Sequence, residues 1–277
     1  MYHPPEEPKT KRSAWKHVAA VLCLCVLAFA LTACSGDKST AYNRAISVFA
    51  SGDYAAAADA FDKLGEYQQA VTYAAYSHGL VFYDKGDYTS AEPYFEKTQD
   101  FMFGKQRYAY CHASVLQEAG TFGEAASGFE SLADFEDAAV RAAYCKARDA
   151  EGRQDYETAL FAYGDAGAYA DAADRLSNLQ TQVYKHAKEL KMDGDYEQAL
   201  NWYALLGDYL DAQAEAKECK DYFRSQQYSQ AEASEQSGDL QKAYDLFSGL
   251  SGYRDAQARA DEVASKLGID TGGSDGN

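Results

Sequence analysis

The chain has 277 residues, of which 47% are apolar, and a formal net charge of −17. The apolar fraction is large enough to build a hydrophobic core, so the composition excludes an intrinsically disordered protein. The acidic balance argues against binding to nucleic acid and against lying flat on an anionic lipid surface, because both carry negative charge.

The N-terminal segment has the pattern of an export signal. An uncharged apolar run, Val18 to Ala33, follows a group of basic residues. These basic residues are Lys9, Lys11, Arg12 and Lys16. As a helix the run would reach only about 24 Å at 1.5 Å per residue, which is less than the hydrocarbon core of a membrane. Residues 1–33 are therefore predicted to be a signal peptide and not a permanent spanning helix.

The apolar run ends in Leu31-Thr32-Ala33-Cys34, followed by Ser35-Gly36. This resembles the bacterial lipoprotein signal, in which the cysteine is acylated, for example with palmitate, and becomes the mature N-terminus. The resemblance implies that residues 1–33 are removed, that Cys34 is the lipidation site and that residues 34–39 are a short tether. It also implies a lipid-anchored protein on the extracytoplasmic face of the cell membrane, or on an outer membrane in a cell with two. The alternative is an ordinary signal peptide whose cleavage site precedes a cysteine.

The rest of the chain repeats a pattern six times. The repeats are marked by turn triplets such as Gly52-Asp53-Tyr54, whose starting positions are 34, 34, 34, 40 and 44 residues apart. Three residues after each triplet comes an alanine: Ala57, Ala91, Ala125, Ala159, Ala199 and Ala243. Seven residues after it comes an aromatic residue: Phe61, Phe95, Phe129, Tyr163, Tyr203 and Phe247. A small residue lies nine positions before the end of each triplet: Ala45, Gly79, Ala113, Ala147, Ala187 and Ala231.

Spacings of three, four and seven residues put side chains on one face of a helix. An aspartate or threonine in each triplet is predicted to be the N-cap of one helix: Asp53, Asp87, Thr121, Asp155, Asp195 and Asp239. A second helix start is predicted at Asp134 and Asp208, with another aspartate three residues later in the first turn. Each copy is thus predicted to be a helix hairpin, and a final helix, Asp255 to Leu267, is predicted to stop at Gly268.

A 34-residue helix hairpin with these residues resembles the tetratricopeptide repeat (TPR) family, most closely at Tyr54, Ala57 and Phe61. The proline that ends the family's repeat is replaced by Asp137, Asp171, Asp211 and Asp255. The resemblance implies an all-α fold, a right-handed α-solenoid of about six TPR-like helix hairpins plus a C-terminal capping helix. It would span residues 40–267, with residues 268–277 as a flexible tail. The two longer intervals predict longer helices or a changed superhelix in the last copies.

The stretch Tyr110-Cys111-His112-Ala113 places a thiol beside an imidazole, which invites a catalytic or metal-binding interpretation. In the repeat, however, His78, His112 and His186 share a position with Arg44, Lys146 and Gln230. Equivalent points on packed helices lie about 8 to 10 Å apart, whereas zinc binds nitrogen at ~2.1 Å. We therefore predict a polar stripe and no metal site. Cys111 and Cys145 are expected to be free thiols, and Cys219 is expected to fall out of register with its helix.

Six tyrosines, here called the ladder tyrosines, lie three residues before the small positions: Tyr42, Tyr76, Tyr110, Tyr144, Tyr184 and Tyr228. In the TPR resemblance the first helix lines a groove that takes a peptide, so these rings are candidate partner-binding residues. The alternative is that they pack between hairpins. Their regularity favours the core, since a ligand surface usually varies.

The predicted function is non-enzymatic, because the sequence contains none of the common nucleophile, phosphate-loop or metal motifs, and no cofactor is expected. We expect a membrane-anchored extracytoplasmic scaffold that binds a protein or peptide partner, with an acidic groove favouring basic segments. Two alternatives remain. One is a cell-wall glycan or solute-binding lipoprotein that uses the ladder tyrosines, and the other is an envelope-assembly lipoprotein.

Overall fold

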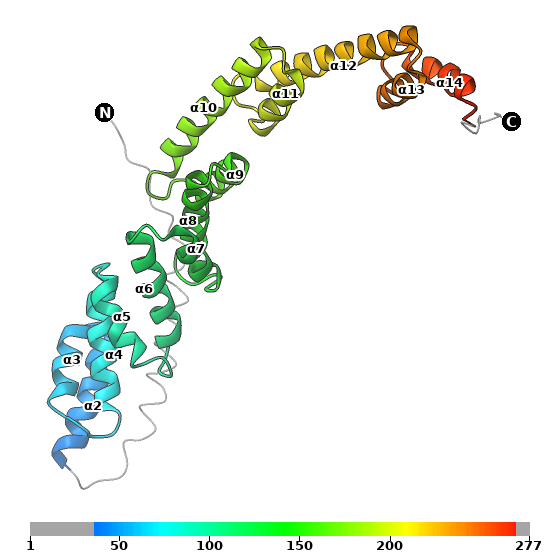
Figure 1. Cartoon of the computed structure of the whole chain (residues 1–277). Coiled ribbons are helices and arrows are strands. Elements are labelled where there is room, and N and C mark those ends of the chain that lie inside the picture. Colours follow the sequence, from blue (N-terminus) through cyan, green and yellow to red (C-terminus); the bar gives the residue numbers. More distant parts are fainter. Residues whose placement is uncertain (1–35, 270–277) are drawn as a thin grey trace, which may run out of the picture. The chain divides into compact units, whose positions relative to one another are not determined.

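The computed structural model describes residues 36–269, and this part of the chain contains thirteen helices and no strand (Figure 1). The helices are α2 (Gly36–Ala50), α3 (Tyr54–Asp62), α4 (Ala70–Tyr83), α5 (Tyr88–Glu96), α6 (Gly104–Glu118), α7 (Phe122–Glu130), α8 (Ala138–Gly152), α9 (Tyr156–Ala166), α10 (Ala172–Met192), α11 (Tyr196–Leu205), α12 (Ala212–Ser237), α13 (Leu240–Gly249) and α14 (Ala256–Leu267). The predicted signal peptide, Cys34 and the tail from residue 270 lie outside the described residues.

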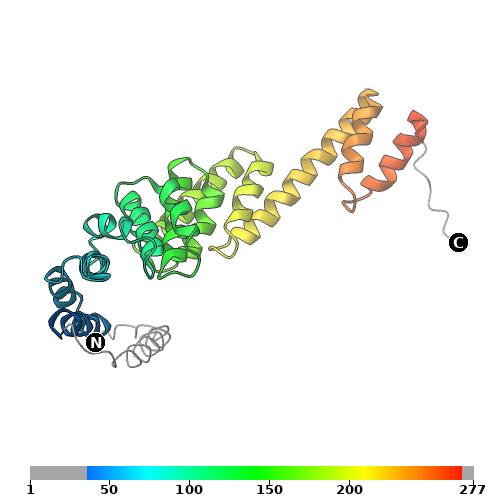
Figure 2. The same ribbon diagram turned by 90° about the horizontal axis from the view of Figure 1, so that it is seen from below.

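The chain divides into two compact units, one ending at Asp149 and the other beginning at Ala150. In the first unit the helices from α2 to α7 pack in sequence, each against the next. In the second unit the helices from α9 to α14 do the same, and α8 contains the point of division. Figures 1 and 2 show the alternation of first and second helices within each unit. This confirms the predicted all-α class and the solenoid-type repeat of helix hairpins.

The second helix of each hairpin begins where the sequence predicts. Aspartates are the N-caps of α3, α5, α9, α11 and α13, and each accepts a hydrogen bond of 3.0 to 3.3 Å from the backbone N–H three residues later. Thr121 is the N-cap of α7 but makes no such side-chain bond. Because the cap satisfies a backbone donor that has no partner inside the helix, it fixes where each second helix starts.

The predicted starts of the first helices were wrong by three or four residues. Helix α8 begins at Ala138 and α12 at Ala212, after the second aspartate of each pair and not at Asp134 or Asp208. The residue just before each N-cap position is left-handed in all six copies, with φ between 48° and 52°, and such a residue cannot lie inside a right-handed helix. These residues are Gln68, Met102, Glu136, Ala170, Leu210 and Arg254. The last helix, α14, ends as predicted at Gly268, whose φ is 72°.

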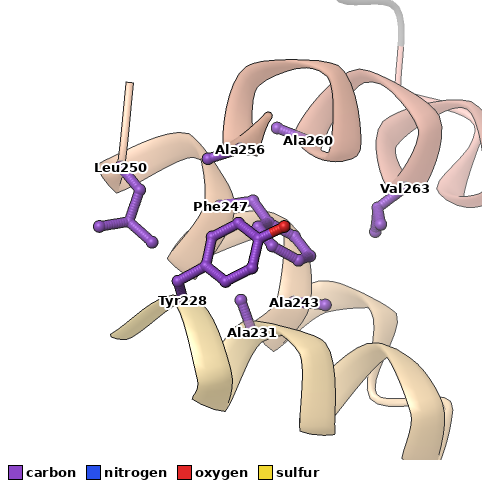
Figure 3. Packing of buried hydrophobic residues seen from close by; sticks show 8 residues of the cluster. All are labelled: Tyr228, Ala231, Ala243, Phe247, Leu250, Ala256, Ala260 and Val263. Carbon is purple, nitrogen blue, oxygen red and sulfur yellow. The ribbon is translucent and has the colours of Figure 1, made fainter. Parts of the chain in front are cut away.

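The invariant positions of the repeat form the core. The six alanines and the six aromatic residues of the second helices are at most 1% exposed. In the last copy, Ala243 and Phe247 of α13 lie between Tyr228 and Ala231 of α12 on one side and α14 on the other (Figure 3). The small alanines allow the helices to approach closely, and the aromatic ring then fills the space between them. A pattern that repeats in sequence thus becomes one continuous apolar layer within each unit.

Helices α10 and α12 have 21 and 26 residues, compared with 14 or 15 in α4, α6 and α8, which confirms the predicted lengthening. The prediction that Cys219 is out of register was wrong. It is the eighth residue of α12 and fully buried, as Cys111 is in α6 and Cys145 is in α8. The additional residues come after it, between the segment that packs on α11 and the segment that packs on α13. Ten of them move the next hairpin about 15 Å along the helix at 1.5 Å per residue.

The space around Gly104 shows how closely the start of a first helix approaches the connection that precedes it. Four first helices and the final helix α14 begin with alanine, but α6 begins with Gly104, and a Cβ there would lie 1.8 Å from the backbone oxygen of Thr98. We expect Gly104→Ala to lower the free energy of unfolding of the first unit by at least ~1–3 kcal/mol, because the backbone has to move. The measurement is urea unfolding followed by far-ultraviolet circular dichroism.

The matched control is Gly164→Ala in the interior of α9, where no atom lies within 4 Å of the added Cβ. Alanine loses less conformational entropy than glycine in a helix, so this change should stabilise by about 0.5–1 kcal/mol. Equal effects of the two substitutions would contradict the predicted close contact at Gly104.

Candidate partner-binding surface

The ladder tyrosines lie on the first helices, one in each of α2, α4, α6, α8, α10 and α12. Five of them are buried, with exposed fractions from 2% for Tyr76 to 9% for Tyr42, and Tyr184 is half-buried. The ring of Tyr110, for example, packs edge-on against Phe129 and Phe135 at centroid distances of 5.5 and 5.9 Å. The five buried rings are therefore part of the core between hairpins, and Tyr184 lies at its margin.

The hydroxyl groups of the ladder tyrosines reach the start of the next hairpin. Those of Tyr110, Tyr184 and Tyr228 donate to a carboxylate oxygen of an aspartate 27 residues later. The acceptors, here called the junction aspartates, are Asp137, Asp211 and Asp255. They occupy the position where the TPR family has its terminal proline. The departure from the family pattern thus has a physical reason, because proline could not accept this hydrogen bond.

Arginines four residues beyond the junction position complete these contacts. Arg141 reaches Asp137 with its Nε at 3.1 Å, and its guanidinium carbon lies 5.2 Å from the ring centroid of Tyr110. At the preceding junction Arg107, which is 4% exposed, donates from Nη1 to the hydroxyl of Tyr76 at 2.9 Å. A buried ring, a carboxylate and a guanidinium from successive hairpins therefore stabilise one another.

Titration behaviour agrees with a structural role for these groups. Burial, together with the hydrogen bond to Asp137, raises the pKa of Tyr110, so the hydroxyl keeps its proton and donates it. Burial also raises the pKa of the Cys111 thiol to about 12 and that of Cys145 to about 11. Cys111, Cys145 and Cys219 are free and buried. A protonated, buried thiol is a poor nucleophile, so the Cys111-His112 pair does not form a reactive centre.

Ion pairs that the sequence analysis did not identify also join the hairpins of the second unit. Glu151 pairs with Arg175 at 3.1 Å and Glu235 with Arg259 at 2.6 Å, each across 24 residues. In the copy between them the signs are exchanged, since Lys191 pairs with Glu215 at 2.6 Å across the same interval. A search for opposite charges 24 residues apart would have found these pairs. The exchange gives neighbouring junctions opposite polarity, which disfavours their mispairing.

The three histidines of the polar stripe lie at the surface, as the sequence predicts. The Nε2 of His78 is 2.9 Å from Asp62, and the Nδ1 of His112 is 2.7 Å from Glu92. His186 instead meets the ring of Trp202 at a centroid distance of 5.3 Å. Within residues 36–269, histidine, cysteine and acidic side chains form no group of three that could hold a metal ion.

Two of these histidines belong to half-exposed aromatic clusters. In the first unit the ring of Tyr94 stacks on His78 at 5.5 Å and on Phe82 at 5.9 Å. In the second unit Trp202 lies 5.3 Å from His186 and 6.0 Å from Tyr156. We call these two groups the histidine–aromatic clusters. The aromatic rings of Tyr94 and Trp202 are half-buried, so part of their surface is open to a partner, unlike that of the five buried ladder tyrosines.

The aromatic members Tyr94 and Trp202 occupy one repeat position, 15 residues after the small residue, where the other copies have Ala60, Gly128, Ala162 and Leu246. The position is not among the residues that stay constant in the repeat. The sequence shows it only as a position whose side chain varies in size from glycine to tryptophan, while the neighbouring core residues remain fixed.

Comparison with known families agrees with the geometry. The tetratricopeptide repeat model matches residues 74–96 and 182–209. The first match covers most of α4 and all of α5, and the second runs from α10 through α11. The chain is a TPR-like helical-repeat protein. A search of curated proteins gives no match.

Each matched segment of this TPR-like protein contains one histidine–aromatic pair, His78 with Tyr94 and His186 with Trp202. Within the described residues, none of the helices combines the length and the apolar character that are needed to cross a membrane.

Two substitutions of one ladder tyrosine distinguish the contribution of its ring to stability from the contribution of its hydroxyl. Tyr110→Ala should lower the free energy of unfolding by about 3–5 kcal/mol, because it deletes a buried aromatic ring. Tyr110→Phe keeps the ring but leaves the carboxylate of Asp137 without its donor, and should cost about 1–2 kcal/mol. Urea unfolding measures both values. As a control, Phe161→Ala, at a side chain that is 62% exposed, should change stability by less than about 0.5 kcal/mol.

The ion pairs of the last hairpin predict a dependence of stability on pH. Hydrogen bonds from Lys266 and Arg259 hold the pKa of the Glu235 carboxyl below its usual value. A depressed folded-state pKa means that the carboxylate stabilises the fold above the unfolded pKa of ~4.3, and that this contribution is lost as the pH falls through the folded pKa. We expect the melting temperature to fall between about pH 5 and pH 3, and Glu235→Gln to weaken that fall.

The measurement is differential scanning calorimetry over this pH range. Glu262→Gln, at an exposed position on α14, is the matched control and should leave the pH dependence unchanged. If the Gln substitutions at positions 235 and 262 give the same profile, the pair of Glu235 with Arg259 is not the source of the acid sensitivity.

Proposed function

We propose that this TPR-like protein is a membrane-anchored, extracytoplasmic and non-enzymatic scaffold that binds a protein or peptide partner. The observation that carries the proposal is the contrast between the two sets of aromatic residues. Five of the six constant ladder tyrosines are buried, whereas the variable aromatic residues of the histidine–aromatic clusters are half-buried and keep part of their surface open to solvent. Core positions are held constant by packing, and exposed aromatic residues are the usual anchors of a binding surface.

The charge of the chain supports a basic partner. The formal net charge is −17, and the predicted signal peptide would remove more basic than acidic residues. Carboxylates also lie next to the accessible rings, with Asp62 beside His78 and Glu92 beside His112. A partner segment with lysine or arginine next to an apolar side chain fits this combination of aromatic faces and negative charge.

The alternative of a glycan or solute binder depended on exposed faces of the ladder tyrosines. Since those rings lie between hairpins, the alternative no longer has a specific observation in its favour. A role in envelope assembly is compatible with the proposed scaffold and would be decided by the identity of the partner.

The first test concerns the anchor. Cys34→Ser should move the protein from the detergent phase to the aqueous phase in a Triton X-114 partition of producing cells, because acyl chains are what hold it in the membrane. Ser35→Ala, at the next residue, is the control and should remain in the detergent phase. Detergent-phase partition of both variants would contradict lipidation at Cys34.

The second test concerns the partner. Cross-linking in intact cells, followed by mass spectrometry, should identify a partner that is lost on Tyr94→Ala or Trp202→Ala and retained by the exposed control Phe161→Ala. Loss of a binding hot spot typically costs 2 kcal/mol or more, which is about a thirtyfold weaker affinity. If the same partners remain with both cluster variants, the histidine–aromatic clusters are not the binding surface.

A further inference from the structure

One edge of the first unit carries a group of exposed apolar side chains. Met102 and Phe103, in the connection between α5 and α6, are 41% and 39% exposed, and Val71 in the first turn of α4 is 58% exposed. Because the hairpins are antiparallel and consecutive, α2, α4 and α6 all begin at this edge (Figure 1). The three side chains therefore lie on the edge of the first unit at which the described chain begins, at Gly36.

The same edge has an unusual charge for so acidic a protein. Four exposed lysines lie near the ends of the helices that meet there: Lys38, Lys63, Lys97 and Lys105. They are balanced by the exposed acidic residues Asp62, Glu66, Glu96 and Asp100. The edge as a whole is thus close to neutral, while the chain has a net charge of −17. This edge therefore repels an anionic surface less than the net charge of the chain would suggest.

The junction residues change from one end of the first unit to the other. At the first two junctions the left-handed residue and the N-cap residue are uncharged, as Gln68-Gln69 and Met102-Phe103. At the third junction the same two positions are Glu136-Asp137. Within the first unit, the exposed apolar pair Met102-Phe103 therefore lies at one of the two junctions nearer Gly36, which is two residues after Cys34 in the sequence. All three side chains keep exposed surface, although the ring of Phe103 also lies 5.9 Å from the guanidinium carbon of Arg107.

We propose that this edge, formed by Val71, Met102 and Phe103 with the four lysines around them, rests on the lipid headgroup layer. The proposal rests on the proposed lipid anchor at Cys34. With so short a segment between Cys34 and α2, an acylated cysteine would hold the start of α2, and with it this edge, at the membrane surface. The apolar side chains enter the interface, and the lysines meet lipid phosphates. The acyl chains supply the attachment, and the edge sets which side of the first unit faces the membrane.

The test uses the full, processed and acylated chain with Met102→Cys, labelled with an environment-sensitive nitrobenzoxadiazole dye. The protein is reconstituted into vesicles of phosphatidylglycerol and phosphatidylethanolamine. Cys111, Cys145 and Cys219 are buried and should not react, which the unsubstituted chain checks. On vesicles the dye at position 102 should shift to shorter wavelength, be quenched by headgroup-labelled nitroxide lipid and show several-fold less quenching by aqueous iodide.

Leu210→Cys is the matched control. Leu210 has the same left-handed conformation, the same place in the repeat and an exposed fraction of 71%, but lies in the second unit beside Asp208 and Asp211. Its dye should stay open to iodide. A chain that floats with the vesicles while both dyes are equally open to iodide overturns the edge contact and leaves the anchor standing. A chain that does not float overturns the anchor, and with it the edge contact.

Discussion

The contact between a ladder tyrosine and the start of the next hairpin is the interaction on which the rest of the structure depends, and at three junctions it includes a hydrogen bond to a junction aspartate. It joins the middle of one first helix to the first residues of the next hairpin, as Tyr110 does with Asp137 and Tyr228 with Asp255. A single helix hairpin cannot cover its own apolar faces, so each copy is stable only against its neighbours. The tyrosine ring supplies the apolar contact, and its hydroxyl fixes where the following helix begins. An aspartate in place of the family's proline thus supplies the acceptor to which the tyrosine hydroxyl donates.

The second unit uses the same contact with a different spacing. Helices α10 and α12 are extended between the segments that pack on successive hairpins, so Cys219 near the start of α12 and Tyr228 further along it serve different neighbours. Ion pairs with alternating polarity accompany this wider spacing, as with Glu151 and Lys191. Because the polarity alternates, each charged side chain meets an opposite charge only at its own junction.

The separation of constant core and variable surface also decides where a function can be sought. Each hairpin uses its tyrosine, alanine and aromatic positions for packing, which leaves few constant residues to build a catalytic pocket. The positions that change between copies are half-buried positions next to the core and exposed positions at the hairpin edges. The histidine–aromatic clusters are of the first kind and the edge around Met102 is of the second. Because the core repeats, residues that differ from their equivalents in other copies are the first place to look for a binding surface.

The sequence by itself determined the helical class, the hairpin repeat, the N-caps of the second helices and the lengthening of α10 and α12. All of these follow from local spacing and from backbone groups that a neighbouring side chain satisfies. It also favoured the core for the ladder tyrosines, because their regularity argued for packing. Only the tertiary structure decided that first helices begin after Asp137 and Asp211, since those carboxylates are used by a tyrosine of the preceding hairpin. The same holds for the pairing of His186 with Trp202 and for the inverted ion pairs. Such contacts join residues 16 to 27 positions apart, and their geometry exists only once the hairpins have packed.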